Sequence, residues 1–235
     1  GSNNKAFRYT YSDESLRLFK DIGDMTDFLI NNIELTGGST LLCSSHNGTI
    51  YIDTVTGETS VTPFNLHNEV SATFTDSKGR IWMSYYNNGI AVFDHNGRIL
   101  QRYSTSDSGL SNDVVLCMTE RDSHIWAGTD GGGINIINPE TSEIKVISHI
   151  AGDPSSLPAH SIKSIYTDEY GNIWAGSIRE GLVRISESGM MTYSDSHIGL
   201  TTGLSNPTVL CLYQDNRTND IWIGTDGEGI NRFNP

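Results

Sequence analysis

The sequence repeats itself with a period of 40 to 48 residues. Each of four copies centres on a tryptophan that follows an isoleucine and precedes a glycine-rich stretch, and a fifth, degenerate copy has leucine at that position. Self-similarity at this period is typical of repeat architectures such as propellers and solenoids. The key positions, with successive steps of 40, 44, 48 and 48 residues, are Leu42, Trp82, Trp126, Trp174 and Trp222.

Each copy contains four short apolar runs separated by turns rich in Asp, Asn and Gly, as in the copy from Val115 to Ile147. No segment shows the 3.6-residue period of an amphipathic helix over a dozen residues. Short strands joined by tight turns predict a four-stranded antiparallel meander, and such meanders repeated in series are propeller blades. We therefore predict an all-β fold, a β-propeller of five blades spanning residues 3–235. Gly1 and Ser2 are typical of residues left by an expression vector.

The two ends of the sequence suggest how the ring would close. The last copy stops after its third run, Ile230–Phe233, whereas Phe7–Thr10 resembles the fourth runs of other copies. We expect Phe7–Thr10 to pair with Ile230–Phe233 and close a five-blade ring, because closure removes exposed sheet edges. The alternative is that the segment belongs to a larger propeller. The tryptophans are expected to pack between blades, not to bind sugar.

Composition excludes several classes of function. The net charge of −13 and the isoelectric point near 4.8 argue against nucleic acid and anionic membrane surfaces as partners. No run of 18 apolar residues is present, so no membrane segment is expected. The three cysteines, an odd number without a CxxC motif, indicate no disulfide framework and are interpreted as small buried apolar residues.

No stretch predicts catalysis, a metal or a cofactor. The glycine-rich turns lack the Lys-Ser/Thr of a phosphate loop, and their glycines are expected at positive φ. The aspartates of the other turns are expected to cap backbone N–H groups instead of binding Ca²⁺. His67 and His160 occupy equivalent places before first strands, with Asp27 and Asp113 comparable, but two histidines are too few for a convincing metal site.

The copies differ most in the turn that follows the tryptophan strand. Two copies have Thr-Asp-Gly-Gly/Glu there, and the other three depart from that pattern. Exposed Tyr, Asn and Arg side chains suit recognition of a sugar or a protein, since they combine a flat apolar face with directional hydrogen bonds. Ordinary variation of loops is the alternative explanation. The candidate ligand-binding residues are His46, Tyr85, Tyr86, Asn88, Arg179 and Glu180.

The last copy, Leu204–Pro235, resembles the two-component regulator propeller repeat, with Ile-Trp-Ile-Gly-Thr-Asp-Gly-Glu-Gly-Ile at its centre. The resemblance is good over residues 65–235 and weak over residues 20–64, where the first copy lacks the tryptophan. It implies a piece of the periplasmic sensor region of a hybrid two-component system. Such a piece would bind an extracellular ligand, a glycan fragment, and act through a homodimer on a kinase outside this chain.

Two other functions stay open from the sequence. The propeller could be a protein-interaction or dimerisation scaffold that binds no small ligand, or a lyase or hydrolase whose catalytic residues come from different blades. No pair of carboxylates and no nucleophile motif points to an enzyme, so a non-catalytic role is expected.

Overall fold

The computed structural model describes residues 5–10, 12–21, 30–45, 48–62, 64, 69–153, 155–194 and 203–234. The chain divides into two compact units, each described by itself. The first comprises Gly1–Tyr86 and Ala91–Gln101, and the second comprises Asn87–Ile90 and Arg102–Pro235. All regular structure in the described residues is β-strand, and none of it forms a helix that could cross a membrane.

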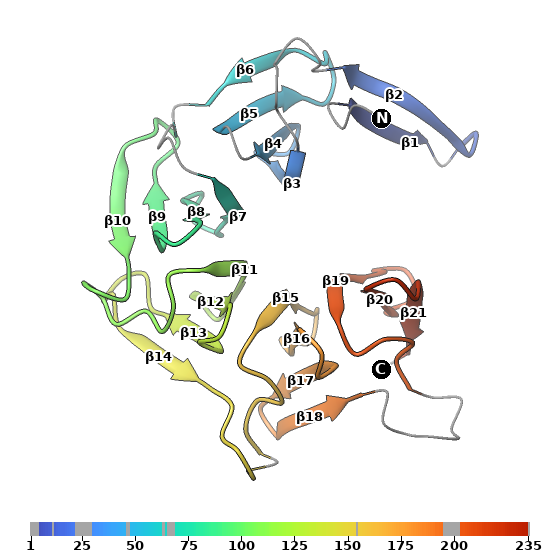
Figure 1. Ribbon diagram of the computed structural model, residues 1–235. Helices are drawn as coiled ribbons and strands as arrows, with labels where there is room; N and C mark the ends of the chain where they lie inside the picture. The colour runs from blue at the N-terminus through green and yellow to red at the C-terminus, as the bar shows by residue number, and fades with distance from the viewer. Residues whose placement is uncertain are drawn as a thin grey trace. The chain divides into compact units, whose positions relative to one another are not determined.

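The first unit holds an N-terminal hairpin, blade 1 and most of blade 2 (Figure 1). Each blade is a meander in which sequence neighbours pair, so that the four strands follow one another across the sheet. The strands are β1 (Lys5–Thr10), β2 (Ser15–Asp21), β3 (Ile30–Thr36), β4 (Thr40–Ser45), β5 (Gly48–Asp53), β6 (Thr59–Val61), β7 (Val70–Thr75), β8 (Ile81–Tyr85), β9 (Ile90–Phe93) and β10 (Ile99–Tyr103).

The second unit holds blades 3, 4 and 5, of which the last has three strands. The predicted all-β fold of five propeller blades is thereby confirmed. The strands are β11 (Val115–Arg121), β12 (His124–Thr129), β13 (Ile134–Ile137), β14 (Ile144–Ile147), β15 (Ile162–Thr167), β16 (Ile173–Ser177), β17 (Leu182–Ser186), β18 (Gly189–Tyr193), β19 (Val209–Gln214), β20 (Ile221–Thr225) and β21 (Ile230–Phe233).

The core lies between successive blades. Trp174 of blade 4 is fully buried against Val209 and Ile221 of blade 5, and its ring meets Phe233 edge-on at 5.4 Å between centroids. Because side chains alternate across a strand, Trp174 of blade 4 faces blade 5, whereas Ile173 and Ala175 face Trp126 of blade 3. Trp82 and Trp174 are thus packing residues, as predicted.

The N-terminal strand pairs differently from our prediction. β1 forms a local hairpin with β2, from Lys5 opposite Asp21 to Thr10 opposite Ser15, and β21 pairs only with β20 among the described residues. The expected pairing of Phe7–Thr10 with Ile230–Phe233 was wrong. A contiguous hairpin closes a much shorter loop than pairing across the whole chain, and β2 supplies the partner strand that the sequence argument overlooked.

The hairpin packs on blade 1 within the first unit. Ala6 and Phe19 contact an apolar cluster that includes Cys43, Ile50 and Ile52, and the Arg8 guanidinium donates to the Thr54 carbonyl. The hairpin therefore covers one face of blade 1, while Ile33 and Leu35 of β3 on the same sheet stay exposed.

Candidate functional site

Blades 2 and 4 share a hydrogen-bonded clamp that holds the tryptophan. The indole Nε1–H of Trp82 donates to Asp76 Oδ2 at 2.9 Å, and that of Trp174 donates to Asp168 Oδ2 at 2.8 Å. The other carboxylate oxygen of each aspartate accepts two backbone N–H groups of its turn. The predicted capping role of these aspartates is confirmed, and both indoles are completely buried.

A second donor completes each clamp. Arg80 Nε reaches Asp76 Oδ2 at 2.6 Å, and Asn172 Nδ2 reaches Asp168 Oδ2 at 2.9 Å. Each buried carboxylate oxygen therefore sits between an indole N–H and a side-chain donor. This pairing satisfies groups whose burial would otherwise cost free energy.

Blade 3 lacks the clamp because its turn is shorter. In blades 2 and 4, five residues, 76–80 and 168–172, lie between the last paired residues of the first and second strands. Between the equivalent pair of blade 3, Glu120 and Ile125, there are only four residues, 121–124. Asp122 and Ser123 both have positive φ, 51° and 60°, which is the geometry of a type I′ hairpin turn. The strands consequently continue one pair further, and Arg121 stands opposite His124 where the clamp aspartate would be.

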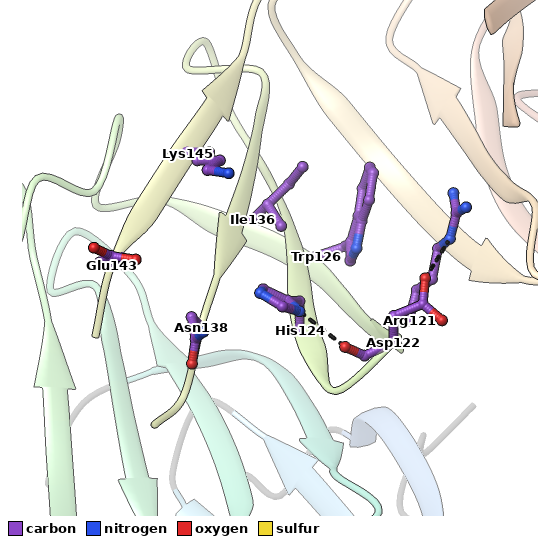
Figure 2. Close-up of a pocket in the computed structure, with 8 residues that line it drawn as sticks. All are labelled: Arg121, Asp122, His124, Trp126, Ile136, Asn138, Glu143 and Lys145. Carbon is purple, nitrogen blue, oxygen red and sulfur yellow. Dashed lines mark hydrogen bonds and ion pairs between the residues drawn. The ribbon is translucent and has the colours of Figure 1, made fainter. Parts of the chain in front are cut away.

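A cavity of about 380 Å³ opens beside Trp126 at this point (Figure 2). Trp126 is 8% exposed, and among the described residues its Nε1–H has no hydrogen-bond acceptor. The Arg121 guanidinium lies 5.8 Å from the centre of the indole. The cavity is lined by one face of blade 3: Arg121, Asp122, His124, Trp126, Ile136, Asn138, Glu143 and Lys145.

Two of the lining side chains have their hydrogen-bonding roles fixed by the backbone. His124 Nδ1 lies 2.8 Å from the Asp122 carbonyl, so it must donate, and a neutral imidazole then keeps a lone pair on Nε2. Asn138 Oδ1 accepts the N–H groups of Glu140 and Thr141, which leaves its Nδ2 donors for other partners. The cavity thus combines an apolar floor with several donors and an acceptor, as ligand sites do.

Sequence reasoning did not find this cavity, although a signal existed. Asp76 and Asp168 stand six residues before their tryptophans, and the blade 3 sequence has Glu120 at that spacing followed by Arg121. A shortened turn without its aspartate predicts an unclamped indole, but only once the clamp itself is known.

A second cavity, of about 640 Å³, opens between blades 1 and 2 and is lined by Tyr51, Thr75 and His95 among others. Leu42, which replaces the tryptophan in blade 1, is fully buried in the core and does not line it. Burial raises the pKa of the nearby Glu34 carboxyl, although the Thr75 N–H donates to its Oε1 at 2.5 Å. Burial and, to a smaller extent, the negative charge of Glu34 raise the pKa of the Tyr51 hydroxyl.

Blade 5 leaves its tryptophan face partly open. Trp222 is 39% exposed and Cys211 on the same face is also exposed, so the expected burial of all cysteines was wrong for Cys211. Hydrogen bonds from Thr218, Asn234 and Arg232 lower the pKa of Asp220 to about 2. Asp220 therefore fastens the end of β21 to the turn before β20.

The predicted turn residues of blades 2 and 4 lie at the opposite strand ends from the Trp126 turn. Tyr86 and Asn88 are exposed in blade 2, and Arg179 and Glu180 are exposed in blade 4. Neither cavity described above includes any of them. Arg179 has φ +78°, where blade 3 has a glycine, and a non-glycine residue there is strained.

Tyr85 and His46 are the other two predicted ligand-binding residues. Tyr85 is the last residue of β8, and its ring is buried, with the hydroxyl donating to the Phe64 carbonyl at 3.3 Å. Strand alternation directs it into the core, so a ligand cannot reach it as predicted. His46 lies outside the described residues, as do His67 and Asp27. Within the part of the chain that the structure describes, no three metal-ligating side chains cluster.

Two stretches of the chain, residues 156–179 and 203–227, match the family model "Two component regulator propeller". They cover the inner parts of blades 4 and 5, including the Trp174 and Trp222 strands. None of the curated proteins is similar in sequence to this chain.

Solved structures share the fold. The extracellular domain of BT3049 from B. thetaiotaomicron, described as a hybrid two component system, has 19% identity and a TM-score of 0.72, covering 98% of this chain and 32% of its own. The extracellular domain of BT4673 from the same organism has 21% identity and a TM-score of 0.71, covering 99% and 30%. This chain therefore spans about a third of their length.

An enzyme has a similar fold. Virginiamycin B lyase from Staphylococcus aureus has 16% identity and a TM-score of 0.67, with 98% of this chain and 77% of the lyase covered. At these identities the likeness concerns the fold alone. The chain is thus a β-propeller in which stretches of blades 4 and 5 match the two component regulator propeller repeat.

Proposed function

We propose that this chain is a non-catalytic, periplasmic sensor propeller that recognises an extracellular glycan fragment. The match of two blades to the regulator repeat, and the extracellular domains among the similar structures, support the sensor role. The observation that carries ligand binding is the cavity beside Trp126, where no described residue accepts the indole N–H. Bound ligand would be reported through a homodimer to a kinase beyond this chain.

Calorimetric titration with a panel of neutral and acidic oligosaccharides tests this function. We expect at least one class to bind with a Kd in the micromolar to millimolar range, and His124→Ala to weaken that binding without changing the melting temperature by more than a few degrees. Chromatography of the ligands after incubation should show no new product. New products would indicate a lyase or hydrolase, and no binding by any member would contradict a glycan sensor.

A second candidate function is protein docking through one exposed turn, either that of blade 2 or that of blade 4. The strained backbone of Arg179 and the 55% exposure of Tyr86 favour it, because strain at a surface turn persists where it serves a role. Truncating Tyr86 or Arg179 to alanine should then weaken dimerisation or partner binding and leave the melting temperature nearly unchanged. An equal loss of stability would show that these side chains are structural.

A further inference from the structure

We infer that the Trp126 cavity binds the carboxylate of an acidic sugar, so that the glycan recognised is a uronate-containing oligosaccharide. The inference rests on the proposed function and names the chemical class of its ligand. It comes from comparing three blades of one chain, which place the same tryptophan beside three different turns.

Blades 2 and 4 show which hydrogen-bond acceptor the indole N–H takes at this position of the repeat. In blades 2 and 4 its N–H donates to a carboxylate oxygen, and a second side-chain donor, Arg80 or Asn172, holds the same oxygen. Trp126 is 8% exposed, no described residue accepts its Nε1–H, and this nitrogen is not among the fully buried polar atoms that lack a partner. Its N–H is therefore accessible from the cavity, where a ligand acceptor would take the position that the clamp aspartate holds in blades 2 and 4.

In blade 3, basic side chains stand beside the place that the clamp aspartate occupies in blades 2 and 4. Arg121 takes the place of the clamp aspartate, and its guanidinium lies 5.8 Å from the centre of the indole ring. Its Nε pairs with Asp122 at 3.2 Å, which leaves the Nη groups to donate to an incoming anion. Lys145 adds another cation on the same face, so that the lining has two cations beside the two carboxylates of Asp122 and Glu143, in a chain with a net charge of −13. Arginine and a neutral N–H together suit a carboxylate.

Other lining side chains favour a sugar acid over a simple carboxylate, because they can bind hydroxyl groups and an apolar sugar face. His124 Nε2 offers a lone pair to a hydroxyl, while Asn138 Nδ2 offers donors to hydroxyl or ring oxygens. Ile136 and the indole give the cavity an apolar side against which the C–H face of a sugar can lie. Both acidic side chains of the lining are exposed: Asp122, the ion-pair partner of Arg121, with its side chain 83% exposed, and Glu143.

The test compares trigalacturonic acid with its methyl ester by calorimetry at low salt, using the whole chain. We expect the acid to bind at least about tenfold more tightly than the ester, as a lost charge-assisted contact implies. Arg121→Gln should remove that preference. Arg217→Gln is the matched control, because it changes the net charge equally in the same unit, at a side chain that is 87% exposed and does not line the cavity. Lys145→Gln, at an exposed side chain, is a second variant should Arg121→Gln unfold.

The outcomes separate this inference from the function beneath it. Equal binding of acid and ester, unaffected by either cavity variant, would overturn the carboxylate site and leave glycan sensing intact. Binding lost equally in Arg217→Gln and Arg121→Gln would assign the preference to net charge and would also overturn the carboxylate site. Binding of neither compound, while a neutral glycan of the panel binds, rejects the acidic ligand alone. If no oligosaccharide of the panel binds, the proposed sensor function itself is rejected.

Discussion

At the scale of single residues, the clamp explains why equivalent tryptophans differ. Trp82 and Trp174 each donate to a buried aspartate and are inaccessible, whereas Trp126 keeps its ring in the core and its N–H without an acceptor. A tryptophan can therefore serve packing with its ring and recognition with one atom, and the turn before it determines which.

The clamp predicts a large effect of Asp168→Ala. The substitution strands a buried indole N–H together with the backbone N–H groups of Tyr170 and Asn172, so we expect a loss of about 2–3 kcal/mol in the free energy of unfolding. Asp168→Asn, which keeps an acceptor oxygen, should lose less. Asp226→Ala in the exposed turn after β20 is the control, with a change within about 0.5 kcal/mol. Urea denaturation measures all three, and equal losses would refute the clamp.

At the scale of elements, the glycine that follows the tryptophan strand in blades 2, 3 and 4 is required by the fourth strand of the same blade. A Cβ at Gly181, φ +85°, would lie 2.2 Å from the Tyr193 carbonyl oxygen of β18. Gly229 has nearly the same φ, +89°, but blade 5 has no described fourth strand and nothing lies within 4 Å. A substitution at Gly229 thus tests the cost of the positive φ alone, whereas one at Gly181 adds the cost of the steric clash.

Alanine at these two glycines should therefore have unequal costs. Gly229→Ala suffers only the unfavourable φ, about 1 kcal/mol, whereas Gly181→Ala must also displace backbone, for a total of roughly 3 kcal/mol. Equilibrium denaturation of both variants checks the difference. Similar losses would mean that a fourth strand also covers Gly229.

The β20–β21 attachment through Asp220 predicts a dependence on pH. Because its folded pKa is lowered to about 2 by the Thr218, Asn234 and Arg232 hydrogen bonds, the charged form stabilises the fold. That contribution is complete above the unfolded pKa of about 3.9 and is lost as the pH falls toward 2. Melting temperatures of the protein and of Asp220→Asn should therefore converge between pH 4 and pH 2. A constant gap across that window would contradict the attachment.

At the scale of the whole molecule, the repeat made the blades predictable. Five key positions at steps of 40 to 48 residues fix the second strand of each blade, and tight turns place the rest. The role of Phe7–Thr10 was mispredicted, because resemblance to a fourth strand ignored the adjacent β2. A blade position can be read from sequence only when the neighbouring strand is considered with it.

The functional cavity was less predictable than the blades. Candidate residues were sought where the glycine turns differ, and Tyr85 in that set proved to be core. The informative difference was in the other turn, where residues 121–124 replace a five-residue aspartate turn. Its consequence depends on the indole hydrogen bond, a contact between positions six residues apart that no local pattern displays.

The most direct test of the central claim is to observe the four indole N–H groups separately. A ¹⁵N–¹H correlation spectrum of the labelled chain, assigned with Trp→Phe variants, should be recorded while trigalacturonic acid is added. We predict that the Trp126 Nε1–H resonance moves with saturation, while the clamped resonances of Trp82 and Trp174 stay in place. A spectrum in which Trp126 is unmoved at saturating ligand, or in which the clamped indoles move instead, would contradict the account.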